Sequence, residues 1–136
     1  MNVLVDTSVW SLALRRTQGK PAAEVGELTS LIAAHRVRII GPIRQELLSG
    51  IRDEASFDVL EQNLAAYPDI ALDTADYVDA ARYFDVCRTK GVQGSNTDFL
   101  ICAVASRRDF AIFTTDKDFI RFAKHVPIRL FGGKPV

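Results

Sequence analysis

The stretch VLVDTSVW, residues 3–10, carries the strongest indication of how this chain folds. Its first three residues form a short apolar run, which is typical of a buried strand. Asp6 ends that run, and Thr7 and Ser8 follow where we expect a helix to begin. Open α/β sheets place their active sites outside the carboxyl ends of their strands. The stretch therefore predicts a functional carboxylate at one edge of a buried sheet.

The same pattern returns near the other end of the chain, in the stretch AIFTTD at residues 111–116. This apolar run also leads to an acid, Asp116. Two strands that each end in Asp can place two carboxylates side by side at one edge of a sheet. Such a pair either holds a cation or repels at a cost in free energy.

Short apolar segments alternate with segments of helical periodicity between these two stretches, which favours a parallel sheet flanked by helices. We predict strands at about 2–6, 37–40, 111–115 and 128–131, and helices at about 8–16, 22–35, 42–50, 53–66, 74–90, 96–107 and 117–124. Residues 70–72 form a short strand at best, and residues 15–21 a polar loop. The buried stripe of the longest helix is expected to comprise Tyr77, Ala80, Ala81, Phe84 and Cys87.

The composition is that of an ordinary globular protein. The 136 residues are 48% hydrophobic and 25% charged, and we expect one domain over 1–136. The charges of the 17 basic and 17 acidic residues cancel, so the net charge does not attract nucleic acid or a membrane. A net charge of zero is still compatible with a surface that has a basic patch beside an acidic pocket. The sequence shows no signal peptide and no long apolar run, so a cytoplasmic protein without a membrane contact is expected.

The two cysteines and two histidines give no sign of a zinc site. Cys87, Cys102, His35 and His125 lie far apart without the spacing of zinc ligands. Both cysteines fall in predicted helices, and we expect them to be buried, reduced thiols.

Two further acids lie in predicted helices. Glu46 has Ile43 and Leu47 at helical spacing, which places it on or beside the core-facing stripe. Asp98 lies in the first turn of the very apolar helix at 96–107. Burying an unpaired carboxylate is costly, so we expect each acid to have a partner.

Ordinary structural roles are an alternative for each acid taken singly. Asp6 and Asp116 could each cap the helix that follows. Ser95 with Asp98, and Thr115 with Asp118, fit the pattern of a capping box. Glu46 could pair with an arginine. Capping does not explain why two of the acids end strands while a fourth lies on an apolar helix stripe.

Four clustered carboxylates have a specific chemistry. Mg²⁺ and Mn²⁺ prefer oxygen ligands and keep waters for a substrate phosphate. Such ions can activate a water and stabilise the leaving oxygen of a phosphodiester. No Ser-His-Asp or Cys-His arrangement and no Gly-rich phosphate loop competes with this interpretation.

The acids and their surroundings resemble a known family. Asp6 is followed by Thr and Ser, Glu46 lies in PIRQELLSG, Asp98 in GSNTDFLICAVA and Asp116 in TTDKDF. In this order the segments resemble the PIN domain, and within it the VapC toxins of bacterial type II toxin–antitoxin pairs. The resemblance covers nearly the whole chain. It implies a three-layer α/β/α PIN-like fold with a short central parallel sheet.

The resemblance also implies an activity and a site. It implies a metal-dependent endoribonuclease in which Asp6, Glu46, Asp98 and Asp116 bind Mg²⁺ or Mn²⁺, with Asp6 and Asp98 the surest direct ligands. Hydrolysis would leave a 3′-hydroxyl and a 5′-phosphate. Ser8 and Thr115 match polar positions that could orient a carboxylate or a water.

Substrate and partners follow from the same resemblance. It implies a structured RNA substrate such as a tRNA or ribosomal RNA loop, a VapB-type antitoxin and a homodimer that assembles further with the antitoxin. Apolar positions such as Trp10 and Leu14 either line a groove for the antitoxin or belong to the core. Candidate RNA-contacting residues are Arg15, Arg16, Lys20, Arg44, Arg52, Lys90 and Lys117.

Three rival functions remain. A non-catalytic PIN-like module would bind RNA or a partner without cutting, but the presence of all four acids disfavours it. A DNA-directed flap nuclease would need longer insertions than this chain has. A phosphatase or nucleotide-binding protein would show motifs that are absent here.

Overall fold

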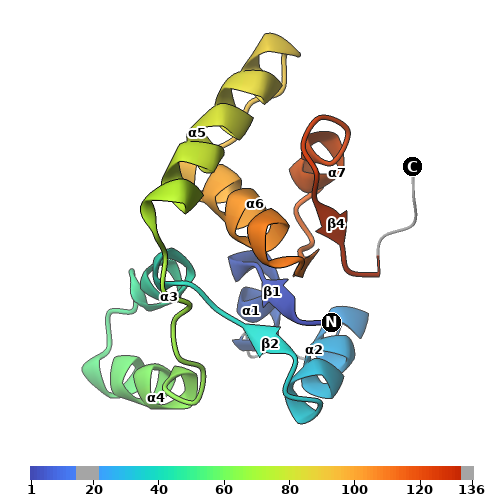
Figure 1. Ribbon diagram of the computed structural model, residues 1–136. Helices are drawn as coiled ribbons and strands as arrows, with labels where there is room; N and C mark the ends of the chain where they lie inside the picture. The colour runs from blue at the N-terminus through green and yellow to red at the C-terminus, as the bar shows by residue number, and fades with distance from the viewer. Residues whose placement is uncertain (15–21, 133–136) are drawn as a thin grey trace.

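A four-stranded parallel sheet forms the centre of the molecule, seen in the computed structural model (Figure 1), which describes residues 1–14 and 22–132. The strand order is β2-β1-β3-β4. The strands are β1 (Val3–Val5), β2 (Val37–Arg38), β3 (Ala111–Phe113) and β4 (Arg129–Leu130). The two inner strands are wholly buried, because helices cover both of their faces. The predicted α/β fold with a parallel sheet is confirmed.

The helices follow the predicted order with small differences at their ends. They are α1 (Thr7–Leu14), α2 (Ala23–Ala33), α3 (Gly41–Leu48), α4 (Glu54–Leu64), α5 (Thr74–Thr89), α6 (Asn96–Arg108) and α7 (Asp118–Phe122). The loop predicted at 15–21 lies outside the described residues. Residues 70–72 do not form a strand, because the only pairing there is an isolated parallel bridge between Ile39 and Asp69. Within the described residues, no helix combines the length and apolar character needed to cross a membrane.

The register of β1 and β3 brings the two acid-bearing ends together. Val5 pairs with Phe113, so Asp6 and Thr114 follow directly at the same edge of the sheet. The Asp6 backbone N–H donates to the Phe113 carbonyl over 2.8 Å, which continues the ladder by one bond. Parallel strands share the direction of their carboxyl ends, so this edge also receives the start of α3 after β2.

Helix α6 is the core helix of the fold. Residues 99–105 are all buried, and α6 packs on β1, on β3 and along α5. Figure 1 shows α5 extending beyond the body of the molecule beside α6. Both cysteines are buried free thiols in these helices, as expected, with Cys87 on α5 and Cys102 on α6.

The predicted buried stripe of α5 is partly wrong. Ala80 and Cys87 are buried and Phe84 is half-buried, but Tyr77 and Ala81 are exposed. Asp76 occupies the buried face in place of Tyr77. Its carboxylate is fully buried, yet hydropathy alone gave no reason to expect an acid there.

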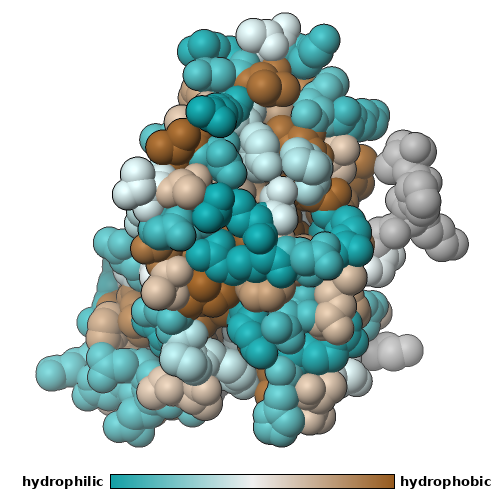
Figure 2. All heavy atoms as spheres, viewed as in Figure 1, coloured by the Kyte–Doolittle hydropathy of each residue, from teal (hydrophilic) through white to brown (hydrophobic). Residues whose placement is uncertain are grey.

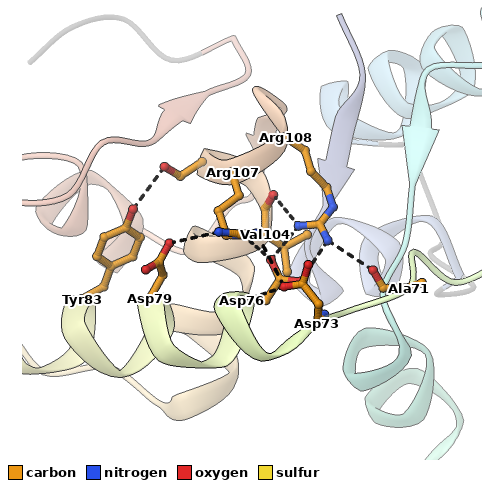
Figure 3. Close-up of polar contacts among 9 residues, drawn as sticks. Ala71, Asp73, Asp76, Asp79, Tyr83, Val104, Arg107 and Arg108 are labelled. Atoms are coloured by element: carbon orange, nitrogen blue, oxygen red, sulfur yellow. Dashed lines mark hydrogen bonds and ion pairs between the residues drawn. The ribbon is translucent and has the colours of Figure 1, made fainter.

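Arginines at the end of α6 explain the burial of Asp76 (Figure 3). Arg108 binds both carboxylate oxygens, at 2.7 and 2.9 Å, and Arg107 Nε donates to Oδ1 at 3.0 Å. Asp76 also completes a capping box with Asp73 at the start of α5. The Arg108 hydrogen bonds outweigh burial and lower the pKa of Asp76 to about 2. This cluster joins the start of α5 to the end of α6.

Candidate active site

Asp6 is the most deeply placed acid of the candidate site. It is 7% exposed and lies between the end of β1 and the start of α1. Its Oδ2 accepts hydrogen bonds from Ser8 Oγ and from Thr114 Oγ1, both at 2.8 Å. Among the described residues, no backbone N–H of α1 donates to the Asp6 side chain, so it does not cap α1 and the capping alternative is wrong for this acid. Two hydroxyl groups instead fix its orientation at the sheet edge.

Thr114 connects the two strand ends. Its hydroxyl donates to Asp6 and accepts from the Asp116 backbone N–H at 3.0 Å. The Thr115 backbone N–H donates to Ser8 Oγ at 3.0 Å. The sequence pointed to Ser8 correctly, but it pointed to the Thr115 side chain where the structure uses Thr114. The parallel register could have identified Thr114, because that residue follows the partner of Val5.

Asp116 is half-buried at the entrance to α7. Its Oδ1 accepts from the Asp118 backbone N–H at 2.9 Å. The capping box predicted for Thr115 and Asp118 is not formed, because the Asp118 N–H, the first of α7, donates to Asp116 instead. The Asp116 side chain therefore binds the start of α7, in line with the capping alternative for this acid. The short turn made by Asp116 holds its carboxylate beside the end of β3.

Asp98 lies in the first turn of α6 and forms the predicted capping box with Ser95. Asp98 Oδ2 accepts from the Ser95 N–H at 3.0 Å, and Ser95 Oγ accepts from the Asp98 N–H at 3.1 Å. Burial raises the pKa of Asp98 above its ordinary value, and the charges of Asp116 and Asp6 raise it further. The hydrogen bonds from Ser95 lower this pKa but do not cancel the rise. Asp98 therefore caps α6, and its carboxylate is also close enough to Asp116 and Asp6 for their negative charges to raise its pKa.

A glycine allows the start of α6 to approach the core this closely. A Cβ on Gly94 would lie 2.6 Å from Phe122 Cζ and 3.0 Å from Phe99 Cε2. The rings of Phe99 and Phe122 are 4.7 Å apart. The segment that presents Asp98 is thus packed directly on α7, which begins just after Asp116.

Glu46 differs from its expected placement. It is exposed, and Ile43 and Leu47 take the buried face of α3. Among the described residues it forms no ion pair, so an arginine partner for Glu46 is not found there. Arg44 pairs with Asp69 at 3.0 Å instead, and also donates to the Leu64 carbonyl at 2.9 Å. Glu46 thus lies on a helix that begins at the same sheet edge, with its carboxylate facing solvent.

The four acids do not form a closed metal cage. In the described part of the chain, no three His, Cys, Asp or Glu side chains lie close enough together to enclose a metal ion. Mg²⁺ usually keeps several waters and binds protein through one or two carboxylates together with substrate phosphates. The donor chemistry fits such an open site, because Asp6, Asp98 and Asp116 each use one oxygen in the hydrogen bonds described above. Their mutual repulsion also favours a cation there.

The chain is similar in sequence to proteins of one family. The profile of the family described as PIN domain matches residues 3–125. Ribonuclease VapC11 of Mycobacterium tuberculosis and VapC ribonuclease Mb1587 of Mycobacterium bovis are each 36% identical to the chain over 119 residues, covering 86% of it and 88% of the relative.

Solved structures share the fold. FitAcB from Neisseria gonorrhoeae superposes with a TM-score of 0.76 at 22% identity, covering 98% of this chain and 97% of that one. VapBC2 from Rickettsia felis, bound to a DNA fragment from its promoter, gives a TM-score of 0.76 at 16% identity, covering 96% and 98%. At these identities the likeness bears on the fold alone.

Proposed function

The chain belongs to the PIN-domain family as a homologue of the VapC ribonuclease toxins, and on that premise we propose that it is a metal-dependent endoribonuclease. Asp6, Glu46, Asp98 and Asp116 are the proposed catalytic and metal-binding acids. The observation that supports this proposal is the link through Thr114, whose hydroxyl binds Asp6 Oδ2 at 2.8 Å and the Asp116 N–H at 3.0 Å. Acids that follow two neighbouring strands thus lie at one edge of the sheet. Burial, and then the charges of Asp116 and Asp6, raise the pKa of Asp98 beside them.

Mg²⁺ or Mn²⁺ is the proposed cofactor, held chiefly by Asp6 and Asp98. The ion would supply Lewis acidity for hydrolysis of a phosphodiester. Asp6 is suited to a ligand role because Ser8 and Thr114 fix its carboxylate. Glu46 is exposed and is proposed to bind the ion or to position the attacking water. Hydrolysis leaves a 3′-hydroxyl and a 5′-phosphate.

The proposed substrate is a structured RNA such as a tRNA or ribosomal RNA, whose cleavage inhibits translation. Sequence-specific proteins read RNA mostly in single-stranded loops whose bases can be splayed out. Asp98 and Asp116 are half-buried and Glu46 is exposed, so such a loop can reach the acids at the sheet edge. Arg44 is not suited to the RNA contact expected from the sequence, because Asp69 and backbone carbonyls bind its guanidinium. Arg15, Arg16 and Lys20 lie outside the described residues.

A VapB-type antitoxin is the proposed partner, and an apolar groove between the end of α1 and α4 is the proposed contact. The groove has a volume of about 410 Å³. Its apolar lining includes Leu14, Ile51 and Val59, which are all exposed. Trp10 is buried and belongs to the core instead, packed edge-on against Tyr67 at 5.4 Å. Trp10 is therefore a core residue, whereas Leu14 is exposed and is proposed to contact the antitoxin.

A homodimer is proposed through the outer side of α5 and α6. Tyr77, Val78 and Val86 on α5 are exposed. Figure 2 shows hydrophobic side chains reaching the surface over this part of the molecule. Tyr77 also lines a cavity of about 330 Å³ with Asn96, Thr97 and Leu100 of α6. This surface lies beside the turn that carries Asp98, and antitoxin binding would build the dimer into a larger assembly.

Sequencing of RNA ends after brief expression in cells tests the proposed activity. Wild-type protein should create new 5′-phosphate ends at discrete sites, and Asp6→Asn should create none. Asp58→Asn, which removes an exposed acid on α4, is the matched control and should cleave like wild type. Equal cleavage by Asp6→Asn would contradict the acid site. RNA binding without new ends would instead support a non-catalytic module.

A further inference from the structure

Three basic side chains form a continuous stripe on α7 and the turn that extends it. Lys117, Arg121 and Lys124 are all exposed. Residues spaced by three or four positions are neighbours on a helix surface, so these three side chains follow one another along one face. The Lys124 N–H donates to the Arg121 carbonyl at 3.2 Å, so the helical path continues as far as Lys124.

The stripe begins at the candidate active site. Lys117 follows Asp116 directly, and the two line one cavity of about 230 Å³. Glu24 and Glu27 of α2 also line this cavity, so the basic stripe leaves the acids behind as it extends to Arg121 and Lys124. The opposite side of α7 is anchored, because Phe119 and Phe122 are fully buried and Phe122 packs against Phe99 of α6. The stripe is therefore held in a fixed position relative to Asp98 and Asp116.

Several arginines elsewhere on the molecule are already paired with acids. Arg107 and Arg108 bind Asp76 of α5 (Figure 3). Arg129 pairs with Asp109. Among the described residues, no ion pair involves any member of the α7 stripe. Asp118 is the acid within α7 itself, and no ion pair between Asp118 and Arg121 is found in the described part of the chain. Three positive charges on one face thus remain available to a ligand.

The zero net charge of the chain makes such a local patch important. With 17 basic and 17 acidic residues, the protein as a whole does not attract a polyanion. RNA would moreover have to approach a centre that is itself acidic. Affinity for phosphates must therefore come from a place where basic side chains are separated from acidic ones.

We propose that the exposed face of α7 binds the RNA backbone on one side of the cleavage site, with Lys117, Arg121 and Lys124 each contacting a phosphate. This inference rests on the proposed ribonuclease function. The stripe covers seven residue steps, or about 10 Å at the helical rise. That length corresponds to about three nucleotides at ~3.4 Å per nucleotide of a stacked strand. The stripe thus guides the strand toward Asp116.

Binding of a fluorescein-labelled oligouridylate, measured by anisotropy over a range of salt concentrations in EDTA, tests the proposal. Each single-strand phosphate that is neutralised adds about 0.7 to the slope of log affinity against log salt. Replacing all three α7 cations with Gln should therefore weaken binding and reduce that slope by about 2. Thermal unfolding should stay unchanged, because all three side chains are exposed.

A matched triple variant removes the same charge from exposed cations that form no ion pair among the described residues. Arg52 follows α3, Arg82 lies on α5 and Lys90 is the residue at the end of α5. The variant Arg52→Gln, Arg82→Gln, Lys90→Gln should keep the wild-type slope. Equal slopes for both triple variants would overturn the α7 proposal.

Cleavage kinetics separate this inference from the proposed function. The double variant Arg121→Gln, Lys124→Gln leaves the acids in place, so KM should rise while kcat is retained. If the wild type cleaves RNA and the double variant has the same KM as the wild type, the α7 proposal is overturned and the ribonuclease proposal stands. A wild-type protein that neither binds nor cleaves RNA would overturn both.

Discussion

Thr114 Oγ1 donates a 2.8 Å hydrogen bond to Asp6 Oδ2, which joins the carboxyl ends of β3 and β1 through their side chains. The same hydroxyl accepts from the Asp116 N–H at 3.0 Å. One threonine therefore positions two of the proposed catalytic acids. This link depends on the parallel register, which places Thr114 beside Asp6.

Replacing Thr114 with Val should reduce both stability and RNA cleavage. The change keeps the side-chain shape but leaves the Asp116 N–H without its acceptor and Asp6 with one donor fewer, at a cost of about 1–3 kcal/mol in unfolding free energy. Urea unfolding and cleavage assays measure the two effects. Thr115→Val is the control and should be nearly neutral, since only the backbone of Thr115 takes part. Similar losses in both variants would contradict the role of Thr114.

Asp98→Asn should abolish cleavage without lowering the melting temperature in EDTA. An Asn oxygen can still accept from the Ser95 N–H, so the capping box is retained. The variant also removes a charge that burial and two neighbouring acids disfavour. Differential scanning calorimetry checks this result. A clear fall in melting temperature would show that Asp98 is mainly a helix cap.

Asp76→Asn should destabilise the protein by about 2–3 kcal/mol at neutral pH, because the two arginines lose the negative charge of their buried partner and one of its two acceptor oxygens. The folded pKa of about 2 lies below the ordinary value of 3.8, so the stabilisation is present above pH 4 and is lost as the pH falls toward 2. Denaturant unfolding at several pH values measures this dependence. Asp85→Asn, which breaks only the exposed pair with Arg88, should cost less than about 1 kcal/mol. Equal effects of the two variants would contradict this account.

Gly94→Ala should destabilise the protein by about 1–3 kcal/mol through overpacking. The added methyl group would lie 2.6 Å from Phe122 and would push the segment before Asp98 away from α7. Gly26→Ala is the control, because a Cβ there meets nothing within 4 Å and Ala favours the helix. Thermal unfolding compares the two variants. A neutral result at Gly94 would show that Phe122 can move aside.

Local patterns predicted the sheet, the helices and three of the acids at its edge. The acid that ends β1 and the capping box at Asp98 are visible in sequence because each depends on neighbouring residues. Asp116 was expected at a strand end, but β3 ends at Phe113 and Asp116 lies three residues further on. Glu46 was expected on or beside the buried face of its helix, but it is exposed. Helical spacing shows that Glu46 lies close to Ile43 and Leu47, but it does not show whether a residue at the border of the apolar stripe is buried. Asp76 was missed, because its burial depends on arginines that lie distant in sequence and meet it only after α5 packs on α6.

Isothermal titration of the metal-free protein with Mn²⁺ tests the central claim most directly. If Asp6 and Asp98 share one cation, wild type and Asp58→Asn should bind Mn²⁺ with the same affinity, and Asp98→Asn should bind it far more weakly. Undiminished binding by Asp98→Asn, or no binding by the wild type, would contradict the account.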